Sequence, residues 1–341
     1  MKMFHAMFVL VFALTGFARE RSAAFLDAMR NGAMANIKLR VVDDDAQPVS
    51  WAKVRVFMGM NFRDRGYWLE GTTDTKGDFV IDGKTTGNEI EIYLFKEGYY
   101  ESKRRLCFIG MGAEHEVSDG KWQPWGSEEK VVLRRIKNPI RLIQAPKGCF
   151  ENEICKTNVN LGFDMKVGDW VIPYGKGVVA DFYAKFQSDG GKPMNSKFSA
   201  LELTFSEPMG GAYCLPVNYD SEFKGVYIAD LSKFSNSKIV LENKVINGQR
   251  MRKMIDDEFL VVRSRCKVNE RGELTSANYS VLRHLTFSTS YTALGCCRMS
   301  YMYNPTPNDT NLEDEETARL SRLKYAQRLE CESRCKGVKK R

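Results

Sequence analysis

Short runs of alternating apolar and polar residues dominate the first third of the chain. The clearest are NIKLRVVD at 36–43, WAKVRVFM at 51–58 and NEIEIYLF at 88–95. A period of two places successive side chains on opposite faces of a strand, so each run has one face that must be covered. Turn-forming residues interrupt these runs at intervals of roughly 8–12 residues, which is typical of a β-sandwich. The pattern therefore predicts a mainly β fold.

One turn in this region, GTTDTKGDFVID at 71–82, has two interpretations. Its acids could bind calcium together with those of the turn at 43–47, since turns at one end of a sandwich lie close together. However, only Asp74 and Asp78 are acidic, Lys76 lies between them, and the spacing differs from that of known calcium loops. We expect a tight turn in which Asp74 accepts backbone hydrogen bonds and Gly77 adopts positive φ. The sequence thus predicts no metal site, and a weak calcium site stays the alternative.

The same region resembles the carboxypeptidase regulatory-like domain. The residues that carry this resemblance are Pro48–Val49, Thr73–Asp74, Gly77, Phe79 and Gly98–Tyr99. The resemblance implies a prealbumin-like (transthyretin-like) β-sandwich over residues 36–137, acting as an accessory rather than a catalytic domain. The chain departs from the family pattern in an aromatic connection at 59–68 and in a long insert at 107–129.

The remainder of the chain predicts two further parts. Residues 147–311 contain more alternating runs and form a second β-rich domain, connected to the first through 138–146. With GKWQPW at 120–125, DWVIPYGKG at 169–177 and YNPTPNDTNLE at 303–313, the chain resembles exported bacterial proteins that carry the same N-terminal sandwich, a resemblance that implies no activity. Residues 312–336 predict a helix that begins at a capping box, Thr310–Glu313. Its expected apolar stripe consists of Leu312, Leu320, Leu323, Cys331 and Cys335.

The N-terminus predicts export. Lys2 precedes an apolar run from Ala6 to Phe17, and Gly16 and Ala18 suit cleavage after residue 18. We therefore expect residues 1–18 to be a signal peptide, the mature chain to be periplasmic or extracellular, and no later segment to insert into a membrane. Nine cysteines cannot all pair within one chain. Cys149 and Cys155 flank a short segment and are the candidates for a local disulfide, while most others are expected to be small buried residues.

Charge and motifs exclude several function classes. The net charge of +8 is scattered, without a basic stripe between aromatic residues, so no nucleic-acid binding is predicted. The sequence has no metalloprotease helix motif, no nucleophile elbow and no phosphate-binding loop. Beyond the signal peptide there are two histidines, His115 and His284. We therefore predict no catalytic residues and no cofactor.

Four aromatic residues lie where the chain departs from its family pattern. Tyr67, Trp68, Trp122 and Trp125 could stack on a ligand, or they could cap the open ends of the sandwich or pack between domains. The favoured function is a non-catalytic binding or accessory module for a cell-surface component, either a glycan or a protein. A hydrolase with its site at the domain junction and a structural subunit of an envelope assembly are the alternatives. The oligomeric state is left open.

Overall fold

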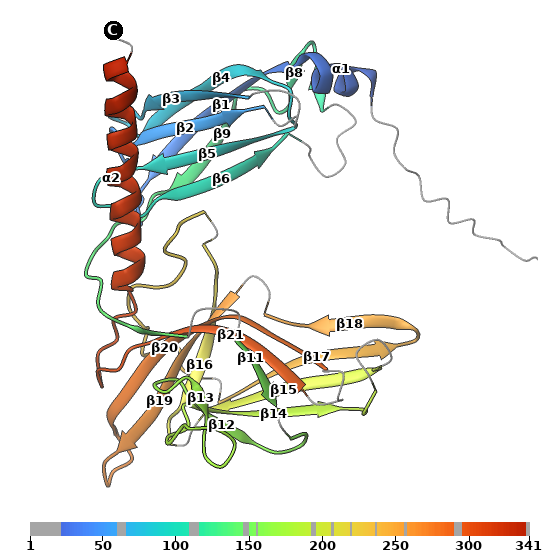
Figure 1. Cartoon of the computed structure of the whole chain (residues 1–341), viewed down its shortest axis with the longest axis vertical. Coiled ribbons are helices and arrows are strands. Elements are labelled where there is room, and N and C mark those ends of the chain that lie inside the picture. The colour runs from blue at the N-terminus through green and yellow to red at the C-terminus, as the bar shows by residue number, and fades with distance from the viewer. Residues whose placement is uncertain are drawn as a thin grey trace, which may run out of the picture.

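The chain folds into a mainly β structure with a C-terminal helix, which confirms the predicted fold class (Figure 1). The computed structural model describes residues 22–59, 66–108, 116–145, 150–154, 156–191, 196–205, 208–218, 220–235, 237–255, 258–289 and 295–338. The predicted signal peptide, Cys149, Cys155 and His115 lie outside the described residues. No helix within these ranges is both long enough and apolar enough to cross a membrane.

The first part is a sandwich of two sheets preceded by a short helix, α1 (Ala23–Asn31). One sheet contains β4 (Asp78–Thr85), β1 (Ala33–Val42), β8 (Lys121–Trp122) and β7 (Val117–Ser118), with β9 (Ser127–Val132) also paired to β1. The other has the order β3 (Tyr67–Thr72), β2 (Lys53–Met58), β5 (Glu89–Phe95) and β6 (Ser102–Cys107). The first strand therefore begins at Ala33, three residues before the expected start.

The predicted alternation packs the core between these sheets. In β2, residues Val54, Val56 and Met58 are buried, while the intervening side chains face outward. The apolar side chains of β1, β5 and β9 fill the same core. Each sheet buries its apolar face against the other sheet, and this burial stabilises the sandwich, because neither sheet could cover its apolar face alone.

The turn at 74–78 has the predicted form. A carboxylate oxygen of Asp74 accepts the backbone N–H groups of Lys76 and Asp78 at 2.8 and 2.9 Å. Gly77 has φ +76°, and a Cβ there would stand 2.4 Å from the carbonyl oxygen of Val41. Only glycine fits both the conformation and the close approach. The Asp78 carboxylate accepts a 2.8 Å hydrogen bond from Arg40 of β1.

The second part contains two larger sheets around another core. One sheet has the order β13 (Asp169–Trp170), β12 (Leu161–Asp164), β14 (Phe182–Ser188), β15 (Phe198–Phe205), β17 (Lys238–Ile246) and β18 (Gln249–Lys253). The other has β10 (Ile143–Gln144), β21 (Gly295–Tyr303), β20 (Leu274–Thr289), β19 (Glu258–Val268) and β16 (Gly211–Pro216), with β11 (Phe150–Ile154) also paired to β21. Apolar residues from both sheets form one buried cluster.

The C-terminal helix, α2 (Glu315–Val338), runs alongside the first sandwich (Figure 1). The predicted capping box at Thr310–Glu313 is wrong. Asp314 caps the helix instead, since its carboxylate accepts both the N–H and the hydroxyl of Thr317. The residue at which a helix begins and the face that it buries both depend on tertiary contacts. Sequence spacing alone does not show these contacts.

The predicted apolar stripe on α2 is also wrong for its described members. Leu320 and Leu323 are 43% and 44% exposed, and Leu312 is buried before the helix begins. The side chains of Cys331 and Cys335 lie outside the described part of the structure. The covered face carries Ala318 and Ser321, whose small side chains let the helix lie close to the first sandwich.

Candidate functional site

An aromatic cluster lies on the outer side of the β3-β2-β5-β6 sheet. We call Phe57, Trp68 and Tyr93 the aromatic face. The Phe57 and Trp68 rings lie 5.2 Å apart, and the Trp68 and Tyr93 rings lie 5.7 Å apart. Phe57 pairs with Trp68 across β2 and β3, so the register of neighbouring strands assembles the cluster. Trp68 stays 43% exposed, which makes it accessible to a partner.

Charged residues surround this aromatic face. The Arg55 guanidinium lies 4.6 Å from the Trp68 ring and donates a 2.7 Å hydrogen bond to Glu70. The Lys103 ammonium lies 5.0 Å from the Tyr93 ring. Two cations therefore lie over rings of the aromatic face, Arg55 over Trp68 and Lys103 over Tyr93.

Glu91 neutralises the positive charge at one side of the aromatic face. Its carboxylate accepts hydrogen bonds from Arg105 at 2.9 Å and from the Tyr93 hydroxyl at 2.8 Å, and it pairs with Lys103 at 3.0 Å. Burial opposes ionisation of this group, but the donors outweigh burial and lower the pKa of Glu91 to about 2. Glu91 is therefore ionised at neutral pH and holds these side chains in place.

The structure separates two of the predicted ligand residues. Tyr67 and Trp68 are adjacent in β3, so their side chains point to opposite sides of the sheet. Trp68 belongs to the aromatic face, while Tyr67 lines a cavity of about 240 Å³. The other lining residues include Asn31, Met58 and Lys84. The sequence analysis treated Tyr67 and Trp68 as parts of one candidate ligand site, although they belong to different surfaces.

The other two predicted residues have different environments. Trp122 is fully buried, stacks on Phe108 at 5.4 Å and donates its ring N–H to the carbonyl of Thr85. It is a core residue and cannot receive a ligand from solvent, which corrects its assignment as a ligand-binding residue. Trp125 is 38% exposed, with the Lys121 ammonium 4.9 Å from its ring.

Phe57, Tyr93 and Arg55 were not identified from the sequence. The sequence does indicate that Arg55 and Phe57 point outward, because they alternate with the buried residues Val54 and Val56. Alternation shows that these side chains leave the core, but the pairing of β2 with both β3 and β5 is what brings them together.

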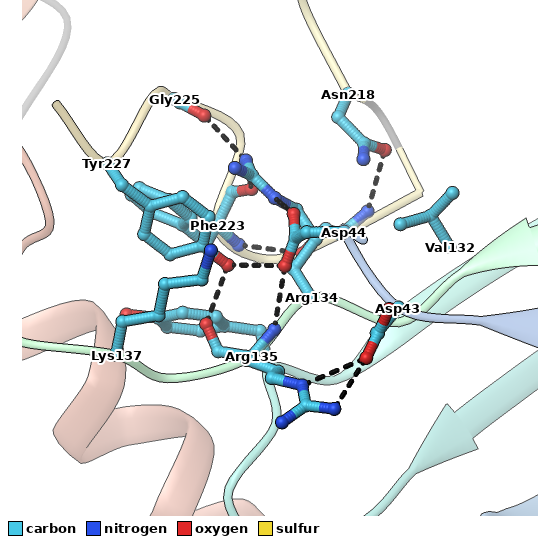
Figure 2. A network of polar contacts seen from close by, with 12 residues as sticks. Asp43, Asp44, Val132, Arg134, Arg135, Lys137, Asn218, Phe223, Gly225 and Tyr227 are labelled. Atoms are coloured by element: carbon cyan, nitrogen blue, oxygen red, sulfur yellow. Dashed lines mark hydrogen bonds and ion pairs between the residues drawn. The ribbon is translucent and has the colours of Figure 1, made fainter. Parts of the chain in front are cut away.

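A second polar site connects the two β-rich parts (Figure 2). Arg134 lies between the rings of Phe223 and Tyr227, each 4.5 Å from its guanidinium. Its Nε donates to Asp44 at 2.9 Å, and its Nη1 donates to the carbonyl oxygens of Phe223 and Gly225. One arginine following β9 thus binds the turn after β1 and the segment that follows β16.

The acids of this junction bind to arginines and to other local donors. Asp44 also accepts the Tyr227 hydroxyl at 2.8 Å and the backbone N–H of Arg135 at 3.1 Å. Asp43 accepts two N–H groups from the Arg135 guanidinium (Figure 2). Burial raises the pKa of Asp43, but backbone and Arg135 hydrogen bonds outweigh burial and lower it overall. Both carboxylates are therefore bound by groups of the protein itself, and Asp44 contacts both β-rich parts.

The helix α2 makes polar and aromatic contacts with the first sandwich. The backbone N–H of Glu101 donates to Ser321, and Arg328 pairs with the Glu101 carboxylate. The Arg328 guanidinium also lies 5.0 Å from the Phe95 ring and 5.8 Å from the Tyr93 ring. The helix thus reaches the edge of the aromatic face.

Metal-ligand clusters do not occur among the described residues. No three His, Cys, Asp or Glu side chains gather there in an arrangement that could hold a metal ion. The acids considered for a calcium site have other partners, since Asp74 binds its own turn and Asp43 binds Arg135. His284 is exposed, on an irregular part of β20 with φ 50°.

No protein-family model matches the chain, and no curated protein matches it. The chain is similar to the solved structure of 3-chlorocatechol 1,2-dioxygenase from Rhodococcus opacus 1CP, with 13% identity and a TM-score of 0.23, over 31% of this chain and 61% of that enzyme. It is similar to catechol 1,2-dioxygenase from Acinetobacter radioresistens, with 12% identity and a TM-score of 0.24, over 32% of this chain and 54% of that enzyme. The matches span less than two thirds of each enzyme, and such low scores carry no conclusion about fold or activity.

Proposed function

We propose that this chain is an exported, non-catalytic binding module that recognises a protein partner through the aromatic face. The observation that carries the proposal is the partly exposed Trp68 ring beside Phe57 and Tyr93, with Arg55 above it. Tryptophan, tyrosine and arginine are the residues that contribute most to binding energy in protein–protein interfaces.

Ring geometry favours a protein over a glycan. Sugar rings stack on flat, open aromatic faces. Here the Phe57 and Trp68 rings are tilted by 56°, and the Trp68 and Tyr93 rings by 59°, so they do not form one flat platform. Cations already lie over the Trp68 and Tyr93 faces. A protein partner can supply carboxylates to these cations and apolar groups to the ring edges.

The junction network supports a non-catalytic role. Its carboxylates, Asp43 and Asp44, are bound to the arginines Arg135 and Arg134. A general base needs a free lone pair within hydrogen-bond reach of a substrate proton. These two acids serve as hydrogen-bond acceptors inside the protein, which is what a rigid connection between two parts requires.

Photocrosslinking tests the proposal in cells that produce the protein naturally. A photoreactive phenylalanine analogue at position 57 should yield a crosslinked protein adduct, and the same analogue at the exposed position 183 should not. Trp68→Ala should abolish the adduct at position 57, while Trp125→Ala should leave it unchanged. Circular dichroism of each purified variant checks that it is folded.

A glycan array separates the two ligand classes. Array binding that Trp68→Ala removes, with no protein adduct at position 57, would replace the protein partner with a sugar. Adducts of equal yield at positions 57 and 183 would reject the aromatic face as the binding surface.

A further inference from the structure

Arg283 is a partly buried charged residue that has no counterion among the described residues. It lies on β20, and its Nε is fully enclosed without a hydrogen-bond partner. It forms no ion pair with any residue that the structure describes. Its backbone carbonyl accepts the Ser300 hydroxyl, but this bond does not use the guanidinium. An enclosed N–H donor without an acceptor is energetically costly unless something binds it.

The guanidinium groups of Arg283 and Arg134 both lie beside Gly225. A Cβ on Gly225 would lie 2.8 Å from Nη2 of Arg283, so the arginine occupies the space beside this glycine. The Gly225 carbonyl oxygen accepts Nη1 of Arg134 at 2.5 Å. None of the Arg134 hydrogen bonds to described residues uses its Nη2. Two arginines therefore meet at Gly225, each with spare donors.

Nearby acids do not neutralise Arg283. Asp314 is the acid that favours its charged form, but the Asp314 carboxylate already accepts hydrogen bonds from Gln144 and Thr317 as the cap of α2. Burial lowers the pKa of Arg283 to about 10; the attraction of Asp314 opposes this effect, and repulsion from Arg134 adds to it. The arginine therefore remains charged at neutral pH, at a cost to the folded state.

We propose that Arg283 and Arg134 form a binding site for a small oxyanion beside Gly225, at the junction of the two β-rich parts. The planar guanidinium matches the oxygen pairs of carboxylate and phosphate groups and donates two parallel hydrogen bonds to them. A water molecule could accept the Nε–H, but it would leave the positive charge of Arg283 without a counterion, whereas Arg134 already pairs with Asp44. A bound oxyanion satisfies the donors and also removes the repulsion between the arginines.

The site has a consequence for stability. The empty site costs stability, because Arg283 keeps an enclosed N–H without an acceptor and lies near the second cation Arg134, and an apolar side chain of similar length removes both effects. Arg283→Met should therefore melt at the same or a higher temperature than the wild type in phosphate-free chloride buffer. A purely structural arginine would give the opposite result.

Thermal unfolding of the full chain tests the site with inorganic phosphate, with sodium chloride of equal ionic strength as the reference. Phosphate at about 100 times its Kd should raise the Tm of the wild type by on the order of 5 °C. Arg283→Met should abolish this shift. Arg319→Met is the matched control, because Arg319 is an exposed arginine of α2 that pairs with Glu316, and it should keep the full shift. Sodium acetate in place of phosphate shows whether a carboxylate suffices.

Gly225→Ala provides a second test that keeps both charges. The added methyl group displaces the Arg283 guanidinium, so the phosphate shift should shrink, and calorimetric titration should show weaker phosphate binding than in the wild type. Equal wild-type Tm values in phosphate and chloride would overturn the proposal. An undiminished phosphate shift in Arg283→Met would overturn it as well.

Discussion

The hydroxyl oxygen of Tyr100 lies 2.9 Å from a carboxylate oxygen of Glu313, although 213 residues separate the two in the sequence. Both side chains are buried. Glu313 also accepts the backbone N–H groups of Lys137 and Asn138 at 2.8 and 2.6 Å. This one carboxylate therefore ties together the first sandwich, the connection after it and the start of α2.

Tyr100→Phe should destabilise the protein by about 1–2 kcal/mol, because it removes one of the donors to a buried carboxylate. Burial raises the pKa of Tyr100, as do the charge and hydrogen bond of Glu313, so the hydroxyl stays protonated and donates throughout the ordinary pH range. Urea unfolding at pH 7 measures the change. Tyr183→Phe, on an exposed residue of β14, should be neutral, and an equal loss in both variants would contradict the assigned role.

Asp44→Ala should loosen the junction between the two β-rich parts. It removes the acceptor of Arg134, Arg135 and Tyr227 and leaves a largely buried guanidinium without its acid, a change that typically costs about 3 kcal/mol or more. Urea unfolding should show a lower midpoint, and limited proteolysis should cut the segment 136–142 faster than in the wild type.

The neighbouring residue provides the control for Asp44. Asp45 is exposed, and its carboxylate makes no hydrogen bond to any described residue. Asp45→Ala should therefore keep the wild-type midpoint and cleavage rate. Equal sensitivity of the two variants would show that the effect comes from the turn itself rather than from the Arg134 contact.

Local signals predicted the strands and turns well. The alternation at 51–58 and 88–95 corresponds to β2 and β5, and Gly77 has the expected positive φ. These features depend on residues close together in the chain. The helix α1 was missed, although Ser22 and Gly32 are typical cap residues for it.

Features that depend on distant partners could not be predicted. Trp122 and Trp125 lie three residues apart, yet one is fully buried and the other is exposed. Spacing does not show which of them contacts Phe108 and Phe25. Likewise, nothing near Arg283 in the sequence indicates that it meets Gly225 and Arg134. Such sites arise from tertiary packing alone.

Asp181→Asn should destabilise the second β-rich part strongly. Asp181 is fully buried and accepts the Ser264 hydroxyl, the Met165 N–H and two N–H groups of Arg265. An amide keeps the shape but removes one of the two carboxylates that compensate Arg265, the other being Asp164, and it weakens the charged hydrogen bonds at a cost of about 2–3 kcal/mol. Chemical unfolding followed by tryptophan fluorescence measures the loss. Asp189→Asn, on an exposed loop, is the comparison, and a larger loss there would contradict the assignment.

The pKa of Glu91 predicts an acid-sensitive contribution to stability. Its folded pKa is about 2 and its ordinary value is 4.5, so below about pH 4.5 the unfolded chain binds a proton that the folded protein does not. The stability from Glu91 is therefore complete at neutral pH and is lost as the pH falls toward 2. Glu91→Gln should cost stability at pH 7, and this cost should be smaller at pH 3 by on the order of 1–2 kcal/mol. Urea midpoints of both proteins at the two pH values give the comparison. Glu97→Gln, an exposed glutamate in the next turn, should show the same small effect at both pH values, whereas a pH-independent cost for Glu91→Gln would exclude its charge as the cause.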